Sequence, residues 1–214
     1  MKEIIERRNS VMPALDVSLE RAVEIVKATS DIEFVRAYKT SLILTGRLGY
    51  DRVVNELRKI TNKLLIHDGQ KLGNDIPETA EKILRPIKES GIDAVIIHPL
   101  SGPNTETAWI RTAQDLGLGI IVGGLMSHPG FLVSEGGYIK DRAALRNIYL
   151  NAAKLGVSDF AVPATKQRYL GLIKTILEDA GVSPIFHVMG FEAQGGSIHG
   201  IANLLEGSSW HAII

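Results

Sequence analysis

Short apolar runs alternate with helical patterns along the whole chain. The runs are continuously apolar, which is typical of strands buried on both faces of a parallel sheet. Eight such runs, separated by seven helical stretches, predict an α/β fold of the (β/α)8 TIM-barrel type, formed as a single domain by residues 1–214. The expected strands are 11–15, 34–38, 63–67, 94–98, 119–123, 159–162, 184–188 and 212–214.

Boundary signals support the helical stretches between these runs. Ser18 is a candidate N-cap for the first helix, and several other stretches are followed by a glycine, where a helix C-terminus favours one. The main alternative is an open, doubly wound sheet, but the dinucleotide fingerprint Gly-x-Gly-x-x-Gly does not follow the first strand. The expected helices are 18–29, 51–61, 77–90, 105–116, 140–155, 167–179 and 198–205.

Composition excludes several classes of protein. The 24 Lys and Arg residues balance the 24 Asp and Glu residues, so the charge excess typical of a nucleic-acid or anionic-membrane partner is absent. With no cysteine, disulfides, thiol nucleophiles and zinc-thiolate sites are impossible, which fits a cytoplasmic protein. The first residues do not resemble a signal peptide, and no apolar run approaches the length of about 20 residues that crosses a bilayer.

Polar residues gather where the expected strands end. In a barrel these positions share one mouth, which is where the chemistry of this fold is found. Some have simpler explanations: Asp16 could cap a helix, His98 could be a structural histidine, and the glycine-rich stretch could be a plain turn. The positions, in chain order, are Asp16, Lys39, Asp68 with Lys71, His98, Ser127-His128, Pro163 to Thr165, and Gly190 to Gly196.

The most informative cluster is Asp68, Lys71 and Asp75, directly after the apolar run 64–66. A lysine between carboxylates stays charged and can deliver a proton to a carbon that becomes negative during a reaction. The competing interpretation is a solvated turn with surface ion pairs. Farther along the chain, the backbone N–H groups near Gly195 and Gly196 precede a short helix and would suit a phosphate.

Taken together, the motifs resemble those of the orotidine 5′-monophosphate decarboxylase family. They occur in family order and span nearly the whole chain. The matching pieces are Ala14-Leu15-Asp16, Tyr38-Lys39, Asp68 to Thr79 with Lys71 and Asp75-Ile76-Pro77, Met126-Ser127-His128-Pro129-Gly130, and Ala193-Gln194-Gly195-Gly196.

The resemblance implies decarboxylation of orotidine 5′-phosphate to uridine 5′-phosphate without a cofactor or metal ion. It makes Lys71 the cation beside C6 and the proton donor, Asp68 the carboxylate that holds Lys71, and Lys39 an extension of the charge array. It also implies a homodimer, in which Asp75, Ile76 and Thr79 reach the neighbouring site. The substrate-binding residues that it implies are Asp16 for the ribose hydroxyls, Ser127 for the pyrimidine, Pro163, and Gln194, Gly195 and Gly196 for the phosphate.

The chain departs from the family pattern in its spacing. The usual Asp-x-Lys-x-x-Asp is lengthened by one residue on each side of Lys71. Residues three apart on a regular strand face opposite ways, so we expect a bulge or turn at Gly69-Gln70. On a regular strand, Gln70 would instead share the face of Asp68. An ungapped alignment would put Arg36 in place of Lys39, but Lys39 lies nearer the strand's C-terminal end.

A second departure lies at the C-terminal end. The family follows strand eight with a Gly-Arg pair whose arginine clamps the phosphate, and this sequence reaches Ile214 before such a pair. We expect a missing tail. Residues 130–140, with their glycines, are a candidate lid.

Three other functions compete with decarboxylation. Sister phosphosugar enzymes of the same superfamily use a related motif, often with Mg2+, but lack the Ser127-His128-Pro129-Gly130 pattern. A metal-dependent epimerase would need His67, His98 or His128 as ligands, which do not have metal-ligand spacing. An inactive nucleotide-binding barrel is compatible with the altered spacing.

Overall fold

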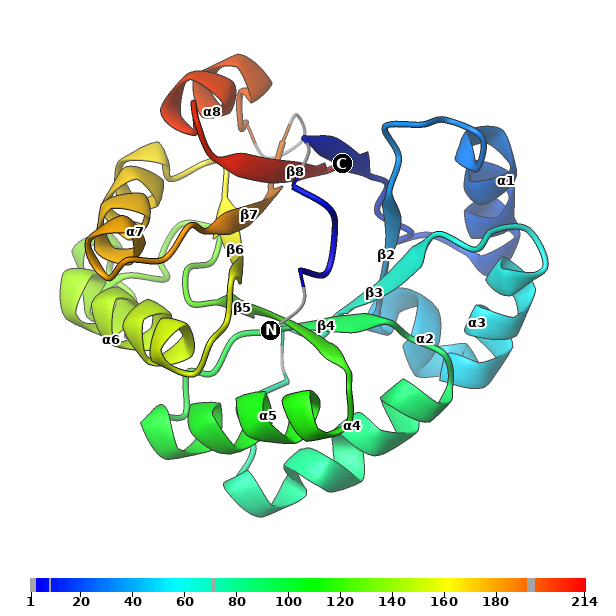
Figure 1. Ribbon diagram of the computed structural model, residues 1–214, viewed down its shortest axis with the longest axis horizontal. Coiled ribbons are helices and arrows are strands. Elements are labelled where there is room, and N and C mark those ends of the chain that lie inside the picture. The colour runs from blue at the N-terminus through cyan, green and yellow to red at the C-terminus, as the bar shows by residue number, and fades with distance from the viewer. Residues whose placement is uncertain (1–2, 8, 71, 192–194) are drawn as a thin grey trace.

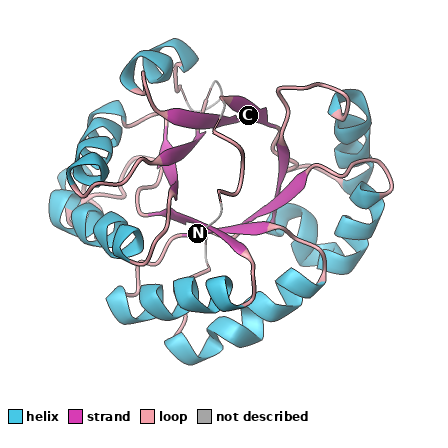
Figure 2. Ribbon diagram, in the orientation of Figure 1, coloured by secondary structure: helices cyan, strands magenta, loops and turns pink. Residues whose placement is uncertain are grey.

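The computed structural model describes residues 3–7, 9–70, 72–191 and 195–214. Within these ranges eight parallel strands form a single sheet that closes into a barrel surrounded by helices (Figures 1 and 2), so the (β/α)8 prediction is confirmed. The strands are β1 (Ser10–Met12), β2 (Ala37–Ser41), β3 (Leu64–Asp68), β4 (Ala94–Ile97), β5 (Gly119–Gly123), β6 (Asp159–Pro163), β7 (Ile185–Met189) and β8 (Ser209–Ile213).

The two ends of the sheet meet at β1. Strand β1 pairs with β8 in parallel, with Ser10 opposite His211. On its other side it meets the β2 segment through two bridges, Val11 with Val35 and Ala14 with Lys39. The ring of strands is therefore complete, and all strand C-termini lie at one end.

The helices connect successive strands and cover the outside of the barrel (Figure 2). None of those within the described ranges is long and apolar enough to span a membrane. They are α1 (Leu19–Thr29), α2 (Leu42–Leu48), α3 (Tyr50–Arg58), α4 (Ala80–Glu89), α5 (Pro103–Asp115), α6 (Asp141–Lys154), α7 (Gln167–Asp179) and α8 (Ile198–Leu204), with short 3-10 helices η1 (Pro77–Thr79) and η2 (Val133–Glu135).

The prediction around β2 was wrong in two respects. The strand lies three residues later than the expected 34–38, because its inward positions carry the polar side chains of Lys39 and Ser41 rather than an apolar run. Helix α2 was missed altogether. It begins directly at the strand end, where the Ser41 hydroxyl accepts a hydrogen bond from the Ile43 N–H at 3.3 Å.

Apolar side chains fill two regions. The larger lies between the barrel and the helices, and the smaller lies inside the barrel. Ile5, from the segment before β1, packs with the inner cluster. The inner cluster comprises Ile5, Met12, Ala37, Ile66, Ala94, Ile96, Ile121, Ala161 and Ile213. Because Lys39 and Asp68 each lie two residues beyond a member of this cluster, they sit just above it, toward the strand C-termini.

Candidate active site

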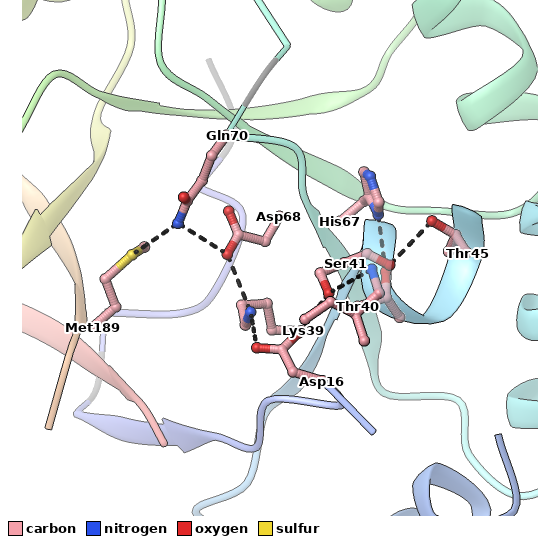
Figure 3. Close-up of polar contacts among 10 residues, drawn as sticks. Asp16, Lys39, Thr40, Ser41, Thr45, His67, Asp68, Gln70 and Met189 are labelled. Carbon is pink, nitrogen blue, oxygen red and sulfur yellow. Dashed lines mark hydrogen bonds and ion pairs between the residues drawn. The ribbon is translucent and has the colours of Figure 1, made fainter. Parts of the chain in front are cut away.

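A buried lysine joins two carboxylates at the C-terminal end of the barrel. Lys39 is only 5% exposed, and its Nζ donates to Asp16 Oδ2 at 2.8 Å and to Asp68 Oδ2 at 3.1 Å (Figure 3). The three residues come from β2, from the segment after β1 and from the last position of β3. The structure thus brings together three of the predicted site residues, with Lys39 inside its strand rather than after it.

Asp16 is held by a second hydrogen bond. The Ser41 hydroxyl donates to Asp16 Oδ1 at 2.6 Å, while Lys39 occupies the other oxygen. The alternative role of Asp16 as a helix cap is wrong, because the cap of α1 is Ser18, which accepts from the Arg21 N–H at 3.3 Å. The Asp16 side chain keeps 37% of its surface exposed, so it can still reach a ligand.

The expected turn follows Asp68 directly. Strand β3 ends at Asp68, and the Leu72 N–H donates to the Gly69 carbonyl at 2.7 Å. A Cβ on Gly69 would lie 2.3 Å from Leu72 Cδ1, so any larger residue here would force the Leu72 side chain to move. Gln70 nevertheless points back toward Asp68: its Nε2 lies 3.4 Å from Asp68 Oδ2 and 3.7 Å from Met189 Sδ (Figure 3).

The electrostatics of the cluster are those of a dry site. Burial raises the pKa of Asp68, and the Lys39 ammonium acts in the opposite direction. Asp68 Oδ1 is buried and has no hydrogen-bond partner among the described residues. Asp68 therefore retains an acceptor for a further donor.

His67 lies on the opposite face of β3, outside the charge cluster. Its ring nitrogens lie 3.1 Å from Tyr50 Oη and 3.3 Å from Thr40 Oγ1. Burial, and secondarily the charge of Lys39, lowers the pKa of His67 to about 4. His67 is therefore neutral at physiological pH and supports the strand from behind.

Lys39, not Arg36, has the geometry of a site residue. The Arg36 guanidinium lies 3.8 Å from the carboxylate of Glu33, whose side chain is largely exposed. Lys39 is nearly inaccessible and contacts two acids.

The segment carrying Asp75, Ile76 and Thr79 is presented on the surface. Ile76 is 59% exposed, Asp75 caps its backbone N–H at 2.7 Å, and the Thr79 hydroxyl donates to the Ile76 carbonyl at 2.8 Å. The preceding residue, Asn74, anchors the segment to the loop after β4, because its amide donates to the His98 carbonyl at 2.8 Å. The segment is fixed at its base and open at its tip.

His98 is enclosed by the barrel. It is almost fully buried, and its ring packs so closely on Gly123 that a Cβ there would lie 2.5 Å from Nε2. Burial lowers the pKa of His98 to about 4, so it carries no charge near neutrality. Its Nδ1 has no partner in the described part of the chain.

The remaining predicted residues follow β5, β6 and β7. Ser127 lies in the loop after β5 rather than on a strand, and its carbonyl accepts from Thr165 Oγ1 at 3.0 Å. Pro163 is the last residue of β6. The Gly196 N–H donates to the Gly190 carbonyl at 3.1 Å, so this N–H group is already paired. The preceding residue, Gly195, adopts a positive φ of 84°. Lys71 and Gln194 lie outside the described residues.

The candidate lid is tied to the body of the protein at its base. Leu132 is fully buried, and the Glu135 carboxylate accepts from the backbone N–H groups of Phe131 and Leu132 and from Lys166 Nζ. The outer part is exposed, with Tyr138 98% accessible.

Sequence reasoning missed part of the site wall. A cavity of about 230 Å3 is lined by the charge cluster together with Ser41, Leu42, Ile43 and Gln70. The polar pair Thr40-Ser41 after Lys39 was the signal for a longer strand, because Ser41 shares the strand face of Lys39. Among the described residues, no group of three or more His, Asp or Glu side chains is placed to hold a metal ion.

Comparison with known proteins places this geometry in context. Residues 9–196 match the family model described as "Orotidine 5'-phosphate decarboxylase / HUMPS family". The orotidine 5′-phosphate decarboxylase of Methanocaldococcus jannaschii is 32% identical over 200 residues, which cover 92% of this chain and 84% of that protein. The enzyme of the same name from Methanosarcina barkeri is 31% identical over 214 residues, which cover 96% and 86%.

A solved structure gives the same result in three dimensions. The M. jannaschii orotidine 5′-monophosphate decarboxylase, complexed with the inhibitor BMP, matches this chain with a TM-score of 0.81 at 30% identity. The match covers 97% of this chain and 89% of that one.

Proposed function

This chain belongs to the orotidine 5′-phosphate decarboxylase / HUMPS family, and we propose that it converts orotidine 5′-phosphate to uridine 5′-phosphate and CO2. The observation that carries the proposal is the buried Lys39 ammonium, held between Asp16 and Asp68 at the mouth of the barrel. A fixed cation in a water-poor site is what stabilisation of a carbanion requires.

The chemistry places a severe demand on the site. Loss of CO2 leaves a carbanion at C6 of the pyrimidine, without conjugation to a carbonyl that could delocalise the charge. Preorganised charges must therefore stabilise it, and they act most strongly where water is excluded. Lys39 fits this role because two short contacts fix its ammonium before substrate arrives.

We assign the reacting end to Lys71 and Asp68. Lys71 protonates C6, and Asp68 orients the lysine and faces the substrate carboxylate. Asp68 Oδ1 has no partner among the described residues, and this supports the assignment, because a buried carboxylate oxygen calls for a donor. Repulsion between Asp68 and the substrate carboxylate would raise the energy of the ground state.

The other end of the substrate is assigned to more distant residues. Asp16 binds the ribose hydroxyls, Ser127 contacts the pyrimidine, and Gln194 with Gly195 holds the phosphate. Pro163 and Gly196 shape the wall, where a Cβ on Gly196 would lie 2.5 Å from Ala164 Cβ. Binding energy from the phosphate can offset the cost of organising the reacting groups.

We further propose a homodimer with shared sites. Asp75, Ile76 and Thr79 would complete the neighbouring subunit's site, and the open, hydrogen-bonded presentation of this segment supports that arrangement. In a symmetric dimer, the segment of each subunit would reach the site of the other.

The decisive experiment measures CO2 release from orotidine 5′-phosphate in the presence of EDTA. We expect turnover by the wild-type protein and by Arg36→Met, and loss of turnover by Lys39→Met. Metal-dependent processing of a keto-sugar phosphate without CO2 release from orotidine 5′-phosphate would instead identify a sister phosphosugar enzyme. Binding of uridine 5′-phosphate without any turnover would identify an inactive barrel and overturn the proposal.

A further inference from the structure

A second cavity lies apart from the charge cluster. It has a volume of about 280 Å3 and is formed by the loop after β4, the start of α5, the segment before α6 and the first turns of α6. Its walls are mainly apolar, with Leu100, Ile139 and Ile148 among them. It shares no lining residue with the cavity at Lys39, so it is a separate site in the described part of the chain.

One carboxyl group lines this apolar cavity. Glu106, in the first turn of α5, is only 2% exposed. Its Oε1 is buried and has no hydrogen-bond partner among the described residues. An unpaired polar atom at such a position is costly, so in native proteins it usually signals a partner.

The surroundings of Glu106 define what that partner must be. Burial raises the pKa of Glu106 to about 7, against a smaller opposing contribution from the Asn151 side chain. Asn147 is the other polar side chain of the wall, and none of the described lining residues is Lys, Arg or His. The wall thus supplies a carboxyl group without a countercharge, which disfavours an anionic ligand.

We propose that this cavity binds a small, mainly apolar primary amine, whose ammonium group donates a hydrogen bond to Glu106 Oε1. The hydrocarbon part of the ligand contacts Leu100, Ile139 and Ile148, and removal of this surface from water contributes to binding. The ammonium supplies both the missing donor and the missing positive charge, whereas an alcohol of the same length supplies only a donor.

Three probes of equal length test the proposal on the intact protein. Binding of n-pentylamine, pentan-1-ol and pentanoate is measured by calorimetry at pH 8, and binding is located by the NMR shifts of the Ile139, Ala144 and Ile148 methyl groups. We expect the amine to bind about tenfold or more tightly than the alcohol, as a charge-assisted hydrogen bond allows, and pentanoate to bind least. Equal affinity of amine and alcohol would overturn the proposal.

Variants separate the carboxylate from the cavity. Glu106→Gln should reduce amine affinity about tenfold and leave alcohol affinity unchanged, whereas Asp115→Asn, an equal charge change at the exposed end of α5, should change neither. Ala144→Phe fills the cavity and should abolish binding of both probes, which keeps the test decisive if Glu106→Gln fails to fold. Unchanged amine affinity in Glu106→Gln or in Ala144→Phe would refute the site. None of these readouts depends on decarboxylation, so the test of the amine site stands even if the proposed decarboxylase activity is not found.

Discussion

Lys39→Met is the substitution that most directly tests the charge cluster. It keeps the length of the side chain but removes the ammonium that lies 2.8 Å from Asp16 and 3.1 Å from Asp68. The Asp16 side chain is 37% exposed and can regain water, whereas that of Asp68 is 6% exposed and regains far less. Asp68 therefore dominates the cost.

Removal of one partner from a buried ion pair costs about 3–5 kcal/mol, because the other charge stays buried. We expect a loss of that size in the free energy of unfolding near pH 7, which is a large share of the roughly 5–15 kcal/mol of a typical domain. Urea unfolding with an unchanged m-value measures it. Arg36→Met is the control, with an expected change of about 0–1 kcal/mol, because its contact with Glu33 is solvated.

The loss should depend on pH in a defined direction. Without Lys39, the folded-state pKa of Asp68, already raised by burial, rises further above its unfolded value of about 4. The native state then binds the proton more tightly, so the free energy of unfolding falls as pH rises above the unfolded pKa. The loss in the free energy of unfolding caused by Lys39→Met should therefore be largest near neutrality and should shrink toward pH 4.

A second substitution distinguishes charge from packing. Lys39→Met with Asp68→Asn removes the stranded charge, so most of the lost stability should return while activity stays absent. If Lys39→Met costs less than about 1 kcal/mol at pH 7, or if the double variant is no more stable than the single one, the charge interpretation is refuted.

Three further predictions concern neighbouring features. Gly69→Ala should destabilise the protein by about 1–3 kcal/mol, because the new Cβ would lie 2.3 Å from the leucine side chain three residues on and would push it aside. Gly46→Ala is the control: it lies in a helix, its new Cβ would meet no atom within 4 Å, and it should stabilise the protein. Urea midpoints that shift in the same direction for both variants would contradict this. NMR titration should give His67 a pKa of about 4, and Lys39→Met should raise it while burial keeps it below 6.5; an unchanged pKa would remove Lys39 as a cause. If sites are shared, mixing inactive Lys39→Met and Asp75→Asn subunits should regenerate about a quarter of wild-type activity. Half of the dimers are then mixed, and each mixed dimer has one intact site out of two. No recovery of activity after verified subunit exchange would refute shared sites.

The architecture could be predicted because its signal is repeated. Five of the eight predicted strands coincide with observed ones to within a residue at each end, since continuous apolar runs mark strands that are buried on both faces. The signal fails where the chain places chemistry inside the barrel. In β2, Lys39 and Ser41 replace apolar inward residues, so the strand was placed too early and α2 was missed.

The site could be predicted only in part. Asp16, Lys39 and Asp68 were found because each lies at or near a strand end, where a parallel barrel collects side chains. The irregularity at Gly69 followed from the spacing of the acids. Two contacts could not be read from the sequence: the Ser41 hydroxyl on Asp16 depends on the register of β2, and Gln70 reaches Asp68 only because of the turn.

The Glu106 site was not predictable at all. Its position in the first turn of α5 looks like an ordinary acidic residue near a helix N-terminus, where negative charge is favourable. The carboxyl group lies in a cavity that α6 and the Ile139 segment help to form, and it is almost fully buried there. Burial in such a place depends on contacts between elements that are far apart in the sequence.

The barrel interior holds two polar layers, one on each side of the inner apolar cluster, and they differ in their access to a ligand. Below the apolar layer lies a second polar layer, in which His187 Nε2 is 2.9 Å from Asp159 Oδ1 and Ser10 Oγ is 2.7 Å from His211 Nδ1. All four side chains are buried on the side where Ile5 packs against the interior, and burial lowers the pKa of His211 to about 3.

The lower layer is buried and its two hydrogen bonds run between its own members, although His187 Nδ1 and His211 Nε2 have no partner in the described part of the chain. The upper layer, with Lys39 and Asp68, lines a cavity, and its Asp68 Oδ1 has no partner among the described residues. Both layers lie in a low-dielectric interior, where charges interact strongly. Within the part of the barrel that the structure describes, the upper layer is the one that combines a fixed ammonium with a cavity, so it can direct that interaction at a ligand.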